Sequence, residues 1–245
     1  MDEDVVLVSV QMANSEVGTE QPVAELAAVA HEHGALMHTD AVQALGKVPV
    51  DVGALDVDAA SFSGHKILGP KGVGALYLKA RTPFDACMLG GGQESGLRSG
   101  TQNVAGIVGF AAAVKACTEN LVHESNRQRE LRDWLYEELG ANPGVKRTVD
   151  VPTGSKRFLP NIVHVLVPGF ESETMVLRLD NEGFGVSGGS ACSSKSLDPS
   201  HVLHAMGIPD DEAYSALRIS FGRFTTKEDL ERFAQAFNRC FARRE

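Results

Sequence analysis

Residues 5–40 alternate between apolar runs and a helical pattern, and this order leaves few folds open to the chain. Residues 5–10 (VVLVSV) are typical of a buried strand, and residues 35–40 (ALMHTD) of a second strand. Between them, Pro22 suits the first turn of a helix and Gly34 suits its end. A strand, a helix and a strand joined by short links predict a parallel sheet with a right-handed crossover.

The same pattern continues along the first half of the chain. Residues 57–63 and 74–78 are typical of strands, and residues 104–119 of a buried helix. The first strand follows Met1 almost at once. Because an interior parallel strand normally comes after other elements, we expect an upstream region of this domain to be missing from the chain.

The composition shifts from glycine- and alanine-rich to charged near residue 120. Residues 121–139 form a long polar helix pattern with leucines on one side. Further strands are expected at 161–167 and 183–187, and further helices at 172–181, 199–206 and 226–242. We therefore predict a partial large domain at 1–120, with a mostly parallel sheet, and a smaller α+β domain at 121–245.

Composition and charge argue against several classes of function. A formal net charge of −9 over 245 residues leaves no basic surplus for a nucleic-acid backbone. No apolar run is long enough to cross a membrane, and the opening MDED does not resemble a signal peptide. The four cysteines show neither a C-x-x-C pair nor zinc-ligand spacing, so we expect a reduced, cytoplasmic protein without a metal site.

Two polar residues point to a cofactor. Asp40 ends one expected strand, where open α/β sheets bind their ligands, and Lys66 follows another in the sequence SGHK. Pyridoxal phosphate needs a lysine for its Schiff base and an acid that faces its pyridinium nitrogen. Singly, Asp40 could cap a helix and Lys66 could be a surface charge. Together they favour a pyridoxal phosphate site.

Cys192 is the cysteine best placed for chemistry. It lies in a run of small residues, SGGSACSS at 187–194, and an attacking thiolate needs access and a mobile tether. The alternative is a small apolar residue in a loop. Cys87, Cys117 and Cys240 lie in or near apolar runs, where we expect packing roles.

Eight short motifs follow one another along the chain. They are MANSEVGT at 12–19, HTDAVQ at 38–43, SFSGHK at 61–66, GPKG at 69–72, GGGQE at 90–94, RSGT at 98–101, GGSAC at 188–192 and LRISFG at 217–222. In this order and spacing they resemble the class V aminotransferase family and, within it, cysteine desulfurases of the NifS/IscS type. The resemblance covers nearly the whole chain and implies a truncated α/β protein of the fold-type I pyridoxal-phosphate-dependent transferases.

The resemblance implies a cofactor role for several residues. Lys66 matches the Schiff-base lysine, which also moves the proton from the substrate α-carbon, and Asp40 matches the partner of the pyridine nitrogen. Gln43 matches a ligand of the ring's phenolic oxygen. Ser63 and His65 match residues that hold the cofactor phosphate, and His65, beside the lysine, is expected to take part in catalysis.

Other matched residues would bind the substrate, carry the sulfur or join two subunits. Arg218 matches the guanidinium that clamps the substrate carboxylate, a task that suits its bidentate fork. Cys192 matches the nucleophile that keeps the sulfur as a persulfide. Thr101 matches a phosphate ligand that reaches across from the other subunit of a homodimer.

The chain departs from the family pattern in two places. Where the family has two successive asparagines this chain has Asn14 and Ser15, and either could contact the cofactor. The family's N-terminal phosphate loop and its ring-stacking histidine have no counterpart in the sequence.

The implied function is a cysteine desulfurase. It would convert L-cysteine to L-alanine and pass the persulfide sulfur to an acceptor or scaffold protein, for iron–sulfur clusters or thiolated tRNA. Two alternatives stay open. One is another class V enzyme, such as a selenocysteine lyase or an aminotransferase. The other is a catalytically incompetent fragment that serves dimerisation or sulfur relay, because the phosphate loop is absent from the sequence.

Overall fold

The computed structural model describes residues 2, 4–188 and 199–242. The chain divides into two compact units, the first made of Met1–Ala13 and Gln21–Leu121, the second of Asn14–Glu20 and Val122–Glu245. No single helix within the described ranges is long and apolar enough to cross a membrane.

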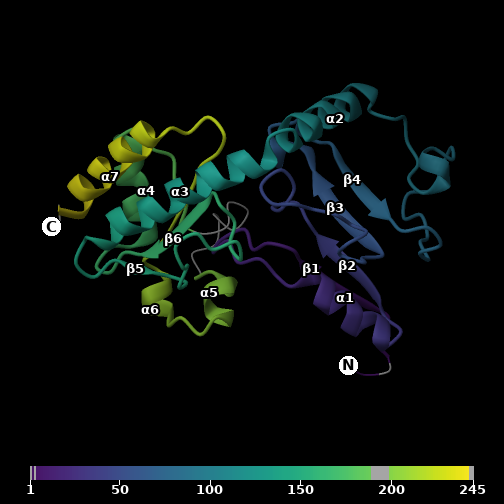
Figure 1. Ribbon diagram of the computed structural model, residues 1–245, viewed down its shortest axis with the longest axis horizontal. Helices are drawn as coiled ribbons and strands as arrows, with labels where there is room; N and C mark the ends of the chain where they lie inside the picture. Colours follow the sequence, from purple (N-terminus) through teal and green to yellow (C-terminus); the bar gives the residue numbers. More distant parts are fainter. Residues whose placement is uncertain (1, 3, 189–198, 243–245) are drawn as a thin grey trace. The chain divides into compact units, whose positions relative to one another are not determined.

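A four-stranded mixed sheet organises the first unit (Figure 1). Its order is β1-β2-β3-β4, in which the first three strands are parallel and β4 runs antiparallel to β3. The strands are β1 Leu7–Gln11, β2 Leu36–Asp40, β3 Ala59–Ser63 and β4 Gly74–Leu78. The mostly parallel sheet expected from the sequence is confirmed.

Two α-helices and two short 3-10 helices complete the first unit. They are α1 Val23–Glu32, η1 Gly64–Ile67, η2 Glu94–Gly96 and α2 Val104–Thr118. The helix α1 connects β1 to β2 and packs against both strands, burying Val23, Ala27 and Ala30 (Figure 1). It ends before Gly34, which adopts a left-handed φ of +75° as the sequence predicts.

Two predictions of burial are wrong. The strand β1 has β2 as its one neighbour in the described sheet, so Val6 is 76% exposed and Leu7 is 52% exposed. The helix α2 forms as expected but leaves Val104 and Val108 exposed. Only one side of α2 is covered within this unit, and an apolar sequence alone does not reveal which side that is.

The second unit is built on a three-stranded antiparallel sheet, β5-β6-β7. The strands are β5 Lys146–Arg147, β6 Ile162–Leu166 and β7 Ala216–Ser220. Its helices are α3 Leu121–Gly140, α4 Ser172–Asn181, α5 His201–Ala205, α6 Asp210–Ala213 and α7 Lys227–Ala242. The core lies between the sheet and helices α3, α4 and α7 (Figure 1). Phe233, Phe237 and Phe241, spaced at four residues along one face of α7, anchor that helix in the core.

One expected strand of the second unit is absent. Residues 183–187 form no strand, and Ser187 forms an isolated bridge with Arg218. The strand β6 lies between β5 and β7, and β7 pairs with it in register over its whole length.

The chain segment Asn14–Glu20 leaves the first unit and packs with the second. Thr19 forms an isolated antiparallel bridge with Phe158, and Leu159 donates its backbone N–H to the carbonyl oxygen of Gly18 at 2.7 Å. The buried guanidinium of Arg132 donates to the carbonyl oxygens of Phe158 and Leu159 and so supports the far side of this contact. The segment is therefore held by backbone pairing to a region much later in the sequence.

Candidate active site

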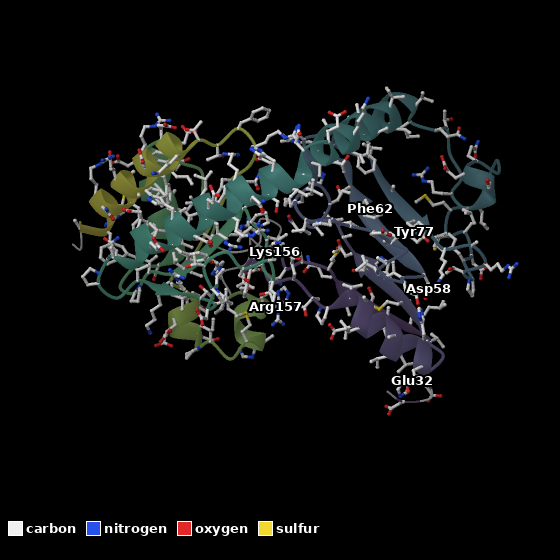
Figure 2. The ribbon with its side chains drawn as sticks, in the orientation of Figure 1. Glu32, Asp58, Phe62, Tyr77, Lys156 and Arg157 are labelled. Atoms are coloured by element: carbon white, nitrogen blue, oxygen red, sulfur yellow. The ribbon has the colours of Figure 1, made fainter. Side chains whose placement is uncertain are left out.

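The carboxyl ends of β2 and β3 bring together most of the cofactor residues predicted for the first unit. The two strands are parallel neighbours, with Asp40 opposite Ser61 in the register. The strand β3 runs directly into η1, which carries His65 and Lys66. Figure 2 labels Phe62 near this end of β3 and Asp58 just before its beginning. The site thus lies at the sheet edge where parallel strands place their ligands.

Asp40 is half-buried and is oriented by its own turn. Its Oδ1 accepts a hydrogen bond from the backbone N–H of Val42 at 2.9 Å. The carboxylate makes no other hydrogen bond within the described part of the chain. One oxygen is therefore left for a further donor, such as a protonated ring nitrogen.

His38 ties the three parallel strands together two residues before Asp40. Its Nδ1 lies 2.7 Å from the hydroxyl of Ser9 on β1, and its Nε2 lies 2.9 Å from the hydroxyl of Ser61 on β3. Both ring nitrogens are therefore engaged with neighbouring strands. The sequence leaves the role of His38 open, and the structure gives it one in cross-linking the strands below Asp40.

The turn after β3 carries a hydrogen-bonded pair, Ser63 and His65, and the amine of Lys66. The hydroxyl of Ser63 lies 2.9 Å from Nδ1 of His65. The Lys66 side chain is exposed, and its amine has no hydrogen-bond or ion-pair partner among the residues that the structure describes. A hydroxyl and an imidazole N–H can donate hydrogen bonds to a phosphate. An available amine can attack the carbon of an aldehyde.

Gln43 is held by a lysine that sequence reasoning missed. The amine of Lys47 donates to the backbone carbonyl oxygen of Gln43 at 2.9 Å and to its Oε1 at 3.2 Å. Burial, with a smaller effect of the positive charge of Lys66, lowers the pKa of Lys47 to about 8. The signal was available, because Gln43 and Lys47 are four residues apart in a helical turn.

The backbone beside Lys47 is packed tightly. Gly46 has a φ of +71°, and a Cβ built on it would lie 2.6 Å from Sγ of Cys117. Cys117 is buried with Ile67 and Phe110, which gives it the expected packing role. Cys240 is buried too, in the core of the second unit, whereas Cys87 is exposed and its expected packing role is wrong.

In the second unit, Arg218 on β7 is fixed on several sides. Its Nη1 donates to the carbonyl oxygen of Ser15 at 2.9 Å. Its backbone N–H donates to Ser187 at 2.7 Å and its carbonyl oxygen accepts from Ser187 at 3.1 Å. On the other side of β7, His164 of β6 lies opposite Arg218 in the register. The guanidinium predicted to bind a carboxylate therefore comes from a well-anchored strand.

His164 is a wholly buried histidine that the sequence did not single out. Its Nδ1 lies 2.7 Å from the hydroxyl of Thr148, and its Nε2 has no hydrogen-bond partner among the residues that the structure describes. Burial, with a smaller effect of the positive charge of Arg218, lowers the pKa of His164 to about 3. This imidazole is therefore neutral at physiological pH.

Asn14 and Ser15 belong to the second unit, whereas Asp40 and Lys66 belong to the first. Oδ1 of Asn14 accepts from the backbone N–H groups of Glu16 and Val17, at 2.8 and 3.0 Å, which builds a tight turn. Ser15 offers its carbonyl oxygen to Arg218. These contacts give both residues a structural role.

The remaining predicted residues are Thr101 and Cys192. Thr101 is exposed in the segment that precedes α2. Cys192 lies outside the described residues, but both flanks of its segment are anchored in the second unit. Ser187 pairs with Arg218, and the hydroxyl of Ser200 donates to the buried carboxylate of Glu16 at 2.5 Å.

The donor set of the first unit fits pyridoxal phosphate. An aldehyde carbon needs an available amine, and Lys66 supplies one that no other described residue engages. A pyridinium nitrogen needs a carboxylate with an open oxygen, and Asp40 supplies it at the neighbouring strand end. No group of three or more histidine, cysteine or acidic side chains in the described ranges could hold a metal ion.

Family membership follows from comparison with known proteins. The chain belongs to the class V aminotransferases, because the family model "Aminotransferase class-V" matches residues 1–233. Among curated proteins it is similar to the cysteine desulfurase IscS of Dictyoglomus turgidum, 44% identical over 229 residues, and to that of Pectobacterium carotovorum, 42% identical over 233 residues. The first alignment covers 93% of this chain and 57% of the relative, and the second covers 94% and 56%.

Solved structures give the same picture. The chain is similar to a NifS-like protein, with a TM-score of 0.89 and 38% identity, over 99% of this chain and 62% of the other. It is also similar to a NifS-like protein from Rickettsia africae, with a TM-score of 0.86 and 33% identity, over 96% and 62%. The predicted fold class and the resemblance to cysteine desulfurases are thus confirmed, for a chain that spans less than two thirds of the length of these relatives.

Proposed function

We propose that this chain acts in a pyridoxal-phosphate-dependent cysteine desulfurase, which converts L-cysteine to L-alanine and keeps the sulfur as a persulfide. The observation that carries the proposal is the arrangement at the ends of β2 and β3. There two neighbouring parallel strands lead to the carboxylate of Asp40 and to the amine of Lys66, which has no partner in the described part of the chain. The curated relatives named as cysteine desulfurases support the same reaction.

Residues of the first unit would hold the cofactor. Lys66 would bind its aldehyde carbon, and Asp40 would pair with the ring nitrogen. Gln43 would donate to the phenolic oxygen, and the linked pair of Ser63 and His65 would donate to the phosphate. When bound, pyridoxal phosphate supplies an electron sink for charge that develops at the substrate α-carbon. The Lys66 amine, once released by the substrate, would move the α-proton, with His65 next to it in η1.

Residues of the second unit would handle the substrate and its sulfur. The guanidinium of Arg218 would bind the carboxylate of L-cysteine through charge-assisted hydrogen bonds. The thiolate of Cys192 would attack the substrate sulfur. The carbon–sulfur bond then breaks, its electron pair stays with the former β-carbon, and that carbon takes up a proton to give L-alanine. The sulfur remains on Cys192 as a persulfide that an acceptor or scaffold protein can receive.

A homodimer is part of this proposal. The segment that precedes and enters α2 exposes large apolar side chains close together in sequence, which a second copy could cover. They are Phe84, Met88, Leu89, Leu97, Val104, Ile107 and Val108. Thr101 lies within the same segment and would serve the phosphate site of the other subunit. We place the protein in the cytoplasm, because its cysteine usage suits a reducing compartment.

A product assay tests the function. The purified chain is incubated with pyridoxal phosphate, L-cysteine and a thiol reductant, and alanine and sulfide are quantified against the Lys66→Ala variant. The proposal expects alanine and sulfide in equal amounts above that control. Pyruvate in place of alanine would show a lyase reaction instead. If neither alanine nor sulfide forms above the control, the alternative of a non-catalytic dimerisation or sulfur-relay partner is favoured.

A further inference from the structure

Lys47 is a half-buried cation that the proposed chemistry does not use. Among the described residues its amine donates to two acceptors, and both belong to Gln43: the backbone carbonyl oxygen and the side-chain Oε1. The turn that follows β2 makes this possible, because Leu45 bonds back to Ala41, and Lys47 and Val48 bond back to Ala44. Residues 43 and 47 are thereby brought onto one side of a helical turn.

The contact decides what the Gln43 side chain can offer. A primary amide carries one acceptor oxygen and one donor nitrogen, and a half-turn of the amide exchanges them. With Oε1 engaged by the ammonium group of Lys47, the exchanged orientation would place an NH₂ group against a cation. The Nε2 of Gln43 makes no hydrogen bond within the described ranges, so it remains a donor for another group.

We propose that Lys47 is a positioning residue: by holding both oxygens of Gln43, it presents the Gln43 amide as a hydrogen-bond donor to the anionic phenolic oxygen of the cofactor. The inference rests on the proposed function, since it needs a cofactor on Lys66. It differs from a packing role, in which Lys47 only fills space beside Cys117. It also differs from a pure charge effect, in which the amine acts on Lys66 without Gln43.

Burial and charge fit this role. A buried ammonium is costly unless its hydrogen bonds are satisfied, so the amine of Lys47 holds Gln43 firmly. The charges that act on Lys47 are those of Lys66, which lowers its pKa, and Cys117, which raises it. Gly46, pressed against Cys117, fixes the backbone between the two partners.

A double-mutant cycle on the absorption of the bound cofactor tests the inference. The visible band of pyridoxal phosphate on a lysine fades as pH rises, and its midpoint reports how strongly the phenolic oxygen is stabilised as an anion. Removing a donor to that oxygen makes it more basic and raises the midpoint. We expect Gln43→Leu and Lys47→Met each to raise it by about one pH unit, the size of one hydrogen bond of about 1.4 kcal/mol.

The decisive comparison is Lys47→Met in the Gln43→Leu background. If Lys47 acts through Gln43, Lys47→Met shifts the midpoint in the Gln43→Leu background by less than half as much as it does in the parent chain. An equal shift in both backgrounds would overturn the inference and leave a charge effect. Lys115→Met, at an exposed lysine of α2, is the matched control and should not move the midpoint.

Two further measurements keep the outcomes separate. The Cε chemical shift of Lys47 is titrated in the cofactor-free chain, where Gln43→Leu should lower the pKa of Lys47, because the charged amine loses an acceptor. An unchanged pKa would overturn the contact itself. If the parent chain binds no cofactor at Lys66, the proposed function and the inference fail together. If it binds and the cycle is additive, the inference alone fails.

Discussion

Nη1 of Arg218 donates to the carbonyl oxygen of Ser15 at 2.9 Å, across 203 positions of sequence. The same short segment, Asn14–Glu20, accepts a hydrogen bond from Ser200 through Glu16. The segment therefore supports both the strand that carries Arg218 and the far flank of the Cys192 region. A stretch near the start of the chain thus shapes the second unit, whose other residues begin only at Val122.

Substrate binding should depend on the fork of Arg218. We expect Arg218→Lys to raise the KM for L-cysteine by about thirtyfold, because losing a charge-assisted hydrogen bond costs about 2 kcal/mol. A lysine keeps the charge but cannot bind the carboxylate and Ser15 together. Steady-state alanine formation measures the effect, with Arg232→Lys on the exposed face of α7 as control. An unchanged KM would remove Arg218 from the substrate site.

Sulfur transfer should depend on Cys192 alone among the cysteines. We expect Cys192→Ala to keep the colour of the bound cofactor and to lower alanine formation from L-cysteine about a thousandfold or more, because the attacking thiolate is gone. Cys87→Ala, at an exposed thiol, is the matched control and should retain full turnover. Full desulfurase turnover by Cys192→Ala would contradict the persulfide role and favour another class V reaction.

Gly46 should matter more for stability than a comparable glycine elsewhere. Both Gly46 and Gly34 have a left-handed φ, which costs an alanine about 1–2 kcal/mol. A Cβ on Gly46 also meets Cys117 at 2.6 Å, whereas Gly34 has open space around it. We expect Gly46→Ala to lose about 1–3 kcal/mol more than Gly34→Ala in urea unfolding of the first unit. Equal losses would show that the contact with Cys117 relaxes freely.

The buried His164 should make stability depend on pH. Its pKa is about 3 in the folded chain and 6.5 when exposed, so between these values the unfolded chain binds one more proton. The contribution of His164 to the free energy of unfolding is therefore complete above pH 6.5. As pH falls from 6.5 towards 3, this contribution is lost by about 1.4 kcal/mol per pH unit.

The variant His164→Gln isolates that contribution. Glu20 has the opposite effect on stability. Burial raises its pKa to about 7, so between pH 4.5 and 7 its contribution to the free energy of unfolding falls as pH rises. Both chains contain Glu20, so the difference in unfolding free energy between parent and His164→Gln reports His164 alone. We expect this difference to shrink from pH 6.5 to 4.5. The exposed His204→Gln should show no such trend, and a flat difference for His164→Gln would contradict a neutral buried ring.

The regular elements of the fold were largely predictable, because local patterns set them. β4 was expected at 74–78 and α4 at 172–181, and both form there. What local pattern could not supply was long-range pairing. The strand β7 and the excursion Asn14–Glu20 depend on partners far away in sequence, and burial of β1 depends on a neighbouring strand rather than on its own apolar residues.

The candidate site was predictable in part for the same reason. Asp40 and Lys66 follow strands that could be neighbours in a mostly parallel sheet, so a shared sheet edge could be expected, and the structure pairs these strands. His164 could not be chosen from the sequence, because its role depends on its burial and on its contact with Thr148. For Lys47 the one sequence signal was its spacing of four residues from Gln43. Cys192 lies outside the described residues, and its role stays a prediction.

The site of covalent attachment tests the central claim most directly. The chain is loaded with pyridoxal phosphate, reduced with borohydride, digested and mapped by mass spectrometry. The account predicts that the pyridoxyl group is found on Lys66, and that Asp40→Ala weakens its loading without changing its position. Attachment at another lysine, or attachment spread over exposed lysines with Lys66 unmodified, would contradict the account.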